Sequence, residues 1–181
     1  FLKDSKNLRI GIARAGNVIG GGDWAENRIV VDCVKAWNNN KKVKIRNPDA
    51  TRPWQHVLEP LYGYMMLALN LQKTEKNNGE AFNFGPNSKL IISVSKLINE
   101  LSSFWNIDFP YDIEIKNDQK YEAKLLKLNC GKAIERLKWH PKLDFEETIK
   151  LTSEWYKRFY SKEDINLLIQ ENIDFFEKKL D

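Results

Sequence analysis

The sequence has few of the residues and runs that mark secreted, membrane-spanning or metal-binding proteins. It holds 2 cysteines in 181 residues, Cys33 and Cys130, which lie far apart with no Cys or His nearby at metal-ligand spacing. This argues against a disulfide framework and a metal site, and indicates reduced thiols in a cytoplasmic protein. No apolar run approaches the roughly 20 residues that span a bilayer, and no cleavable signal pattern begins the chain. We therefore expect a cytoplasmic protein with no membrane segment.

A block of charge of one sign is missing as well. The chain carries 29 Lys and Arg against 25 Asp and Glu, and the two signs are interspersed. Nucleic-acid-binding domains concentrate basic residues on one face, so the scattered charge argues against nucleic acid as a partner. The length suits one domain or a substantial part of a larger one. Residues 1–4 (FLKD) resemble the interior of a gene product, so we expect a fragment.

Hydrophobic patterning predicts an α/β protein. Residues 8–14 and 42–46 alternate as half-buried strands do, and helical spacing predicts a helix over 25–39, capped by Asp23, and an apolar core helix over 60–72. Alternating strands and helices favour the second half of a parallel sheet. The same patterns predict a strand at 80–86, a helix capped by Ser93, a helix opened by an Asp144–Glu147 capping box, and a closing amphipathic helix opened by Ser161–Asp164.

The segment 50–60 (ATRPWQHVLEP) carries the most chemistry per residue. It places an arginine, a tryptophan and a histidine between two prolines, at the start of an apolar helix. Proline fixes φ and pushes the preceding residue out of the α region. We therefore predict extended backbone at Arg52 and Glu59, with Pro60 as the first helical residue. The segment is predicted to be a rigid platform for its side chains.

Three polar side chains follow or lie near the predicted strands: Asn17, Arg52 and Asn83. Parallel sheets bind ligands at the carboxyl ends of their strands. A guanidinium suits phosphate oxygens, and an amide both donates and accepts hydrogen bonds. The three residues are therefore predicted to hold a phosphate or a sugar. For Trp54 and His56 two interpretations stay open, contact with a ligand, or support, with Trp54 in the core and His56 bonded to backbone.

Three segments make the sequence similar to a known family: 13–25 (ARAGNVIGGGDWA), 45–64 around Arg52, and 81–86 (AFNFGP). They resemble the C-terminal portion of the extended short-chain dehydrogenases/reductases that act on nucleotide sugars. Within that family the Pro-Trp-Gln-His run after Arg52 points to the CDP-glucose 4,6-dehydratases. The resemblance covers most of residues 9–160.

The resemblance implies roles for ten positions. Arg52 and Asn17 would hold the pyrophosphate or sugar, and Asn83 would lie near the nucleotide. The helix start at Arg28 and the strand at 44–46 would frame the cytosine and ribose. Glu122 belongs to a weaker match, in which Tyr121 departs from the family pattern. The implied substrate-binding residues are Asn17, Arg28, Ile29, Val30, Arg46, Arg52, Asn83 and Glu122, and the implied cofactor-binding residues are Ala15 and Val18.

The fold and reaction that the resemblance implies belong to a longer enzyme. Residues 1–181 would supply the latter strands of a Rossmann-type parallel sheet and a small mixed α/β substrate-binding lobe. Family members use NAD as a recycled oxidant to convert CDP-glucose into CDP-4-keto-6-deoxyglucose and water, a lyase reaction that supplies deoxysugars for lipopolysaccharide O-antigen. The whole enzyme is expected to be a homodimer.

Two parts of that chemistry are missing from the sequence. No G-x-x-G-x-x-G loop follows a strand, and no tyrosine precedes a lysine by four residues. The glycines at 20–22 lack dinucleotide spacing and form either a flexible turn or a close approach to a ligand. We therefore expect the NAD-binding half upstream, no catalytic residue in this chain, and no turnover by the chain alone. The alternatives are another NAD-dependent nucleotide-sugar dehydratase or epimerase, or a remnant that binds a nucleotide sugar without turnover.

Overall fold

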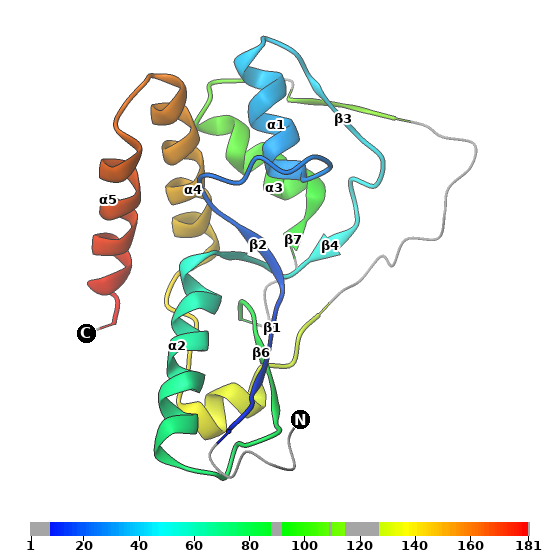
Figure 1. Ribbon diagram of the computed structural model, residues 1–181. Helices are drawn as coiled ribbons and strands as arrows, with labels where there is room; N and C mark the ends of the chain where they lie inside the picture. Colours follow the sequence, from blue (N-terminus) through cyan, green and yellow to red (C-terminus); the bar gives the residue numbers. More distant parts are fainter. Residues whose placement is uncertain (1–7, 88–91, 109, 115–126, 181) are drawn as a thin grey trace.

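The computed structural model of the chain describes residues 8–87, 92–108, 110–114 and 127–180 (Figure 1). Its strands are β1 (Ile12–Ala15), β2 (Asn17–Ile19), β3 (Val43–Ile45), β4 (Thr51–Arg52), β5 (Trp54–His56), β6 (Ala81–Phe84), β7 (Ile92–Ser93) and β8 (Tyr111–Ile113). Its helices are α1 (Ile29–Asn38), α2 (Leu58–Lys73), α3 (Val94–Ser103), α4 (Phe145–Tyr160) and α5 (Ile165–Glu177), with a π-helical turn η1 (Ala133–Leu137). The predicted α/β class is confirmed.

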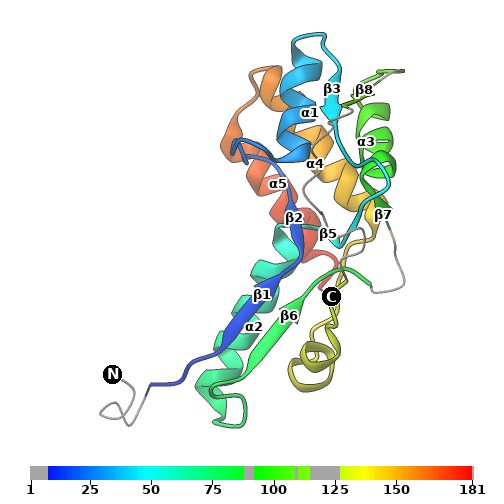
Figure 2. The same cartoon turned by 90° about the vertical axis from the view of Figure 1, so that its right-hand side faces the viewer.

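Strands that are distant in sequence pair in parallel. β1 pairs with β6, with Ala13 opposite Phe82, and β2 pairs with β5, with Asn17 opposite Trp54. β3 pairs in parallel with β8, whereas β4 pairs antiparallel with β7. Helix α2 connects β5 to β6 and packs on β1 and β6, which lie side by side in Figure 2. Such a helical crossover is what parallel strands require, because a tight hairpin would reverse the chain.

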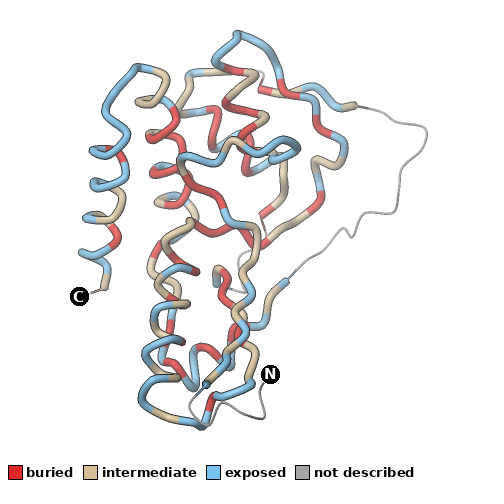
Figure 3. Tube along the Cα trace, in the orientation of Figure 1, coloured by how far each residue is buried: buried red, intermediate tan, exposed pale blue. Residues whose placement is uncertain are grey.

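One hydrophobic core joins α1, α3 and α4 to strands β2 and β3. In Figure 3 the buried positions lie along the helices where they face one another. Strand β3 confirms the predicted alternation, since Val43 and Ile45 are buried and Lys44 between them is exposed. The largest contributors to this core are Trp37 on α1, Leu97, Ile98 and Leu101 on α3, and Ile149, Trp155 and Tyr156 on α4.

A second core lies between the β1–β6 pair, α2 and η1. Phe82 and Phe84 are fully buried on one face of β6, as predicted, and Asn83 between them is partly exposed. The Trp139 ring packs edge-on against Phe84, with ring centroids 5.1 Å apart. Gly63 lets α2 lie directly on this cluster, because a Cβ there would be 2.3 Å from Phe84 Cδ1. The helix therefore packs on the strand by backbone approach.

Helix α1 begins later than predicted. It starts at Ile29 rather than 25, and Asp23 does not cap it. The Asp23 carboxylate instead accepts the Ala25 backbone N–H at 2.9 Å, within a turn. Asn27 adopts a left-handed backbone with φ 61°, and Arg28 is extended. These two conformations interrupt helical hydrogen bonding, so the helix starts only after them.

Helix α2 begins earlier than predicted. It starts at Leu58, so Glu59 is helical rather than extended and Pro60 is the third helical residue. The first turn of a helix has no intrahelical partner for its N–H groups, so a proline there loses no hydrogen bond. The buried Glu59 carboxylate accepts the Lys142 and Leu143 backbone N–H groups at 2.7 and 2.6 Å. These tertiary bonds favour the helical start over the local preference before proline.

The predicted core role of α2 holds for only part of the helix. Leu67 is buried against the β1–β6 pair. Three other apolar residues, spaced four apart, form an exposed α2 face on the described residues: Leu61 at 45% exposure, Met65 at 60% and Leu69 at 55%. The apolar pattern of this helix is therefore wider than the surface that the described part of the chain covers.

The closing helices confirm one predicted cap and correct the other. Asp144 and Glu147 form the predicted capping box of α4. The predicted Ser161–Asp164 box is wrong. Ser161 lies at the end of α4, where its hydroxyl donates to the carbonyl four residues earlier, and Asp164 alone caps α5 by accepting a backbone N–H two residues on. A capping box opened by Ser161 would need residues 162–164 as the first turn of the helix, but these residues connect α4 to α5.

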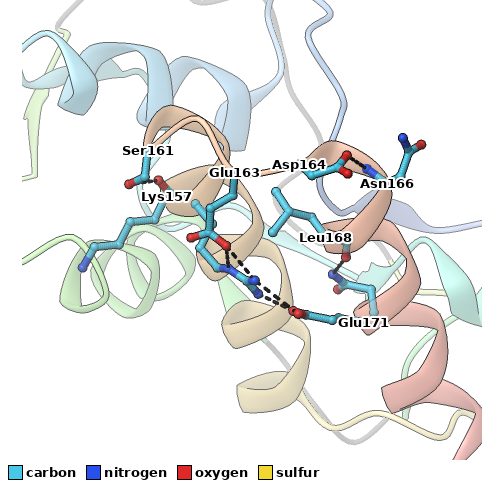
Figure 4. A network of polar contacts seen from close by, with 9 residues as sticks. Lys157, Ser161, Glu163, Asp164, Asn166, Leu168 and Glu171 are labelled. Atoms are coloured by element: carbon cyan, nitrogen blue, oxygen red, sulfur yellow. Dashed lines mark hydrogen bonds and ion pairs between the residues drawn. The ribbon is translucent and has the colours of Figure 1, made fainter.

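Ion pairs and a partly buried stripe hold α5 beside α4. The Arg158 guanidinium donates to Glu163 at 2.7 Å and to both carboxylate oxygens of Glu171, so it bridges the two acids, as the dashed lines in Figure 4 show. Leu168 and Phe176 of α5 are buried in hydrophobic clusters that include residues of α4. The predicted stripe is wider than the buried surface, since Ile165 and Ile169 are exposed.

Replacing Gly63 by alanine tests the close packing of α2 on β6. On an exposed helix this change stabilises by about 1 kcal/mol, because glycine loses more backbone entropy. Here the added Cβ would meet Phe84 at 2.3 Å, so we expect destabilisation of about 1–3 kcal/mol from overpacking. Urea denaturation of the Gly63→Ala variant measures the change. Adding Phe84→Leu, which replaces the opposing ring with a smaller side chain, should recover part of the loss. A Gly63→Ala variant more stable than the unmodified chain would contradict the close packing.

Candidate functional site

A cavity of about 770 Å³, the large cavity, opens where β1 and β2, the start of α1, β3 and the β4–β5 segment meet. Most of its lining residues come from the stretches 15–23, 27–32, 44–47 and 50–57, and Val94, Leu128 and Tyr156 complete the lining. Eight of the ten positions implied by the sequence line it: Ala15, Asn17, Val18, Arg28, Ile29, Val30, Arg46 and Arg52. The fold therefore gathers residues that span 38 positions in sequence, from 15 to 52.

Strand pairing positions the two central polar side chains of this cavity. Asn17 begins β2 and lies opposite Trp54 of β5, so Arg52 is two residues before the residue that pairs with Asn17. Arg52 itself lies on β4, opposite Ile92 of β7, and its Nη1 donates to the Thr51 carbonyl at 2.9 Å. Backbone pairing on two separate strands thus brings the predicted amide and guanidinium to one cavity.

The glycine run after β2 packs on helix α4. A Cβ at Gly21 would lie 2.1 Å from the Trp155 ring, so the loop backbone rests on that ring. The Tyr156 hydroxyl donates to the Asp23 carbonyl at 2.6 Å and holds the end of the loop. Gly20 and Gly21 also line the large cavity. The glycine run is therefore held against an indole of the same chain rather than forming a flexible turn, and its close approach to a ligand stays a prediction.

The charges around the large cavity suit an anion. Its lining holds the cationic side chains Arg28, Lys44, Arg46 and Arg52 and the acidic side chains Asp23 and Asp32. Burial raises the pKa of Asp32, and nearby Lys35 partly offsets this shift. The raised pKa reduces the negative charge of Asp32 at acid pH. The first turn of α1 also lines the cavity, and no side chain caps it. Uncapped N–H groups and the helix dipole favour negative charge at this end.

Trp54 and His56 differ in what they contact. Trp54 is buried and lines the large cavity, so it belongs to the cavity surface as well as to the core. His56 is 2% exposed, does not line the cavity, and its Nδ1 accepts the Leu58 backbone N–H at 3.4 Å. Burial lowers the pKa of His56 to about 4, so the ring is neutral at pH 7. The supporting interpretation describes His56.

For the other two implied positions, the structure places one outside the lining of the large cavity and does not describe the other. Asn83 lies outside its lining, because the Asn83 side-chain amide donates to the Asn129 carbonyl at 2.9 Å across from β6. Glu122 and the neighbouring Tyr121 lie outside the described residues. Their predicted contacts with a nucleotide stay predictions.

Several lining residues were missed from the sequence. Asp32 lies within the predicted helix 25–39 but has no predicted role, although an acidic residue in the first turn of α1 is a usable signal. Asn27 gave a weaker signal, as a residue type that tolerates the left-handed backbone. Leu128 and Tyr156 lie more than 70 positions after Val57 in the chain, so no local sequence pattern links them to the cavity.

The described residues offer no alternative chemistry of metals or thiols. No group of three or more His, Cys, Asp or Glu among them is arranged to hold a metal ion. Cys33 and Cys130 are both buried and unbridged, and burial raises the pKa of each thiol. Among the helices that the structure describes, none is long and apolar enough to cross a bilayer.

Comparison with known proteins gives two sequence relatives. The chain is 39% identical over 166 residues to CDP-glucose 4,6-dehydratase of Salmonella typhimurium, a match that covers 91% of the chain and 46% of the relative, in its C-terminal part. It is 27% identical over 108 residues to dTDP-glucose 4,6-dehydratase of Streptomyces antibioticus, covering 59% and 29%. The chain thus spans less than half the length of these relatives. No protein-family model matches it.

Solved structures share the fold. UDP-glucuronic acid 4-epimerase of Bacillus cereus, solved with UDP-glucuronic acid and NAD, matches with a TM-score of 0.70 and 19% identity, over 84% of this chain and 46% of that one. dTDP-glucose 4,6-dehydratase of Bacillus anthracis, solved with NAD, matches with a TM-score of 0.67 and 17% identity, over 82% and 44%. At these identities the likeness concerns the fold alone, and it covers about half of each enzyme.

Replacing His56 tests whether its neutral, buried state supports the fold. The folded chain holds His56 at a pKa of about 4, below its ordinary value of 6.5. Between these values the unfolded chain binds a proton that the folded chain does not, so this contribution to stability is lost as pH falls from 6.5 towards 4. A His56→Asn variant keeps a hydrogen-bond acceptor without the titration. We expect its Tm to fall less than that of the unmodified chain over this range.

The difference between the two proteins is the quantity to measure, because Glu59 acts in the opposite direction. Burial raises the pKa of Glu59 to about 7, so its contribution to stability falls as pH rises from about 4.5 to about 7. Glu59 is present in both proteins, and its effect cancels when the two Tm curves are subtracted. A difference that does not change with pH would contradict the role of His56.

Proposed function

Because this chain is a relative of CDP-glucose 4,6-dehydratase with the fold of the extended short-chain dehydrogenases/reductases, we propose that it is the nucleotide-sugar-binding part of such a dehydratase. The proposed reaction of the whole enzyme converts CDP-glucose into CDP-4-keto-6-deoxyglucose and water. The part played by this chain is to bind and orient the sugar nucleotide. The proposal concerns a longer protein, since the chain spans 46% of the first relative.

One observation carries the proposal: eight positions implied by the resemblance line a single cavity with an excess of cationic side chains. Its volume of about 770 Å³ lies within the range of ~300–1,000 Å³ common for small-molecule sites. Arg52 and Asn17 are proposed to hold the pyrophosphate, because a guanidinium pairs with two phosphate oxygens at once and an amide donates to a third. The α1 start and β3 are proposed to frame the cytosine and ribose.

The chain offers NAD only part of a site. Ala15 and Val18 line one side of the large cavity, and their backbone is proposed to contact the nicotinamide. The sequence has no glycine-rich dinucleotide loop, so the remaining contacts are proposed to come from an upstream part. NAD, when bound there, supplies a recycled hydride acceptor. Loss of water is feasible because a ketone at C4 of the sugar acidifies the neighbouring C5–H.

Two alternative functions are compatible with the same cavity. Another nucleotide-sugar dehydratase or epimerase would use the pyrophosphate contacts unchanged and differ at the base. A remnant that binds without turnover would keep the cavity and lack an upstream partner. If the CDP-glucose assignment holds, the product would supply deoxysugars for surface polysaccharides such as O-antigen, from a cytoplasmic homodimer.

Binding measurements on Arg52 variants test the proposal. Arg52→Gln removes a charged hydrogen-bond donor from the proposed pyrophosphate site, which typically costs ~1.5–3 kcal/mol, or roughly ten- to a hundredfold in affinity. We expect that loss for CDP-glucose by calorimetry. Lys150→Gln, an equal charge change at an exposed position of α4 that does not line the cavity, should leave affinity unchanged.

A series of nucleotide sugars tests the base within the same experiment. CDP-glucose is expected to raise Tm more than UDP-, GDP- or dTDP-glucose at equal concentration. Equal Tm shifts with all four would be consistent with a nucleotide-sugar site but would contradict the CDP assignment. An unchanged affinity in Arg52→Gln would contradict the pyrophosphate site itself.

The upstream part is proposed to pack on two separate surfaces, the exposed α2 face and the outer edge of β1. Among the described strands β1 pairs with β6 alone, and its residue Ile12 is 51% exposed. Parallel sheets are normally covered on both faces, and the open edge of a strand can pair with a further strand. The exposed α2 face (Leu61, Met65 and Leu69) is a separate apolar surface, on the side of the helix away from Gly63 and Leu67, which pack on the β1–β6 pair.

A charge on the exposed α2 face should weaken assembly with the upstream part of the same protein. Met65 is 60% exposed, so Met65→Glu should leave the stability of the chain unchanged while it buries a carboxylate in the proposed interface. We expect at least about a tenfold weaker association when the two parts are produced separately and mixed. Leu167→Glu, at a residue of α5 with 49% exposure, is the matched control and should associate normally. Equal association of both variants would argue against this face.

A further inference from the structure

A second, much smaller cavity shares Arg52 and Trp54 with the lining of the large cavity. We call it the small cavity. It is enclosed by β5, the first turn of α2, and the segment around Leu143 that leads into α4. It offers about 10 Å³ to the centre of a water-sized sphere, which is close to the space that one water molecule requires. Of the residues that line the small cavity, Arg52 alone has a role in the proposed function.

Three residues of the small cavity carry buried polar atoms that have no hydrogen-bond partner. They are the indole Nε1 of Trp54, the side-chain oxygen Oε1 of Gln55 and the carboxylate oxygen Oε2 of Glu59. Gln55 and Glu59 are each 2% exposed and Trp54 is 7% exposed. An unpaired buried polar group costs ~1–3 kcal/mol, so three on the lining of one cavity call for a shared ligand.

The other polar lining groups are already engaged. The Thr148 hydroxyl donates to the Asp144 carbonyl at 2.8 Å, and the Asp144 carboxylate caps α4. Arg52 donates to the Thr51 carbonyl. The remaining walls are largely apolar, with Pro86, Ile92 and Leu143 among them. The ligand is therefore recognised by one N–H donor and two oxygen acceptors.

That set of partners selects a neutral ligand that both donates and accepts. A cation would face the Trp54 N–H, and an anion would face the Glu59 carboxylate and the Gln55 oxygen. We infer that the small cavity is a binding site for one water molecule, which accepts from Trp54 Nε1 and donates to Gln55 Oε1 and Glu59 Oε2. Buried waters commonly make about three such bonds. A proton on Glu59 that was donated to Gln55 would instead leave Trp54 unpaired.

The water would complete a set of contacts that joins four elements. Glu59 Oε1 accepts two backbone N–H groups from residues 142 and 143, just before α4. The Gln55 amide donates to the Phe84 carbonyl at the end of β6, at 2.8 Å. Through Trp54 the same water reaches the surface of the large cavity. The water thus fixes the orientation of an indole whose residue lines both cavities, whatever the large cavity binds.

Water-selective NOE spectroscopy on the ¹⁵N-labelled protein tests the site. We expect a cross-peak between a long-lived water and the indole N–H of Trp54. The indole N–H of Trp139 is the internal control, because it is also buried and unpartnered but does not line the small cavity. It should give no cross-peak. Trp54→Phe and Trp139→Phe identify the two resonances, and Thr148→Val excludes relay through the one hydroxyl of the lining.

Two variants at Glu59 sharpen the test while they keep the Trp54 reporter. Glu59→Gln retains a polar partner for the water, so the cross-peak should persist. Glu59→Met removes that partner, so the cross-peak should disappear or fall several-fold. If Glu59→Met does not fold, the contrast between Trp54 and Trp139 in the unmodified protein still decides.

A high-resolution crystal structure gives the direct measurement. One fully occupied water within hydrogen-bond distance of the three atoms is the expected result. An empty cavity, a direct Glu59–Gln55 hydrogen bond, or a Trp54 N–H without a water cross-peak would each overturn the inference. None of these outcomes depends on nucleotide-sugar binding, so failure here and failure of the proposed function are distinguishable.

Discussion

The parallel pairing of β2 with β5 is the constraint on which the candidate site depends. It sets Asn17 opposite Trp54 and so brings Arg52, two residues earlier, to the same cavity. The strand then leads directly into α2, which packs on the β1–β6 pair and returns the chain to that pair. One short pairing therefore orients both the cavity and the second hydrophobic core. Trp54, Gln55 and His56 are all buried, so a shift of the register by one residue would move each of these side chains to the opposite face of the strand pair.

Close backbone approaches hold this arrangement, and both involve aromatic rings from distant segments. Gly21 rests on the Trp155 ring beside the large cavity, and Gly63 rests on Phe84 beneath α2. Rings are rigid and bring much apolar area to a contact at little entropic cost. The loop after β2 is consequently positioned by α4, more than 130 residues away in sequence. The helices after residue 144 thus shape the cavity even though they contribute Tyr156 alone to its lining.

The segment 51–59 has two chemically different sides. Towards the large cavity it presents the Arg52 guanidinium, in a lining with more cationic than acidic groups, which suits a charged ligand. Behind it, Gln55, His56 and Glu59 are almost fully buried and bond to backbone groups. Buried polar groups of this kind rigidify a segment only when all their atoms are paired. A bound water in the small cavity would meet that requirement.

The sequence by itself determined the α/β class, the strands at β3 and β6, the caps at Ser93 and Asp144, and eight residues of the large cavity, because alternation, capping chemistry and family motifs are local signals. Only the tertiary structure decided the helical start at Glu59, since bonds to residues 142 and 143 outweigh the local effect of Pro60. It also decided that Asn83 bonds to Asn129, that Tyr156 joins the cavity, and that Met65 is exposed. Each of these depends on contacts between residues far apart in the chain, and local periodicity carries no record of such contacts.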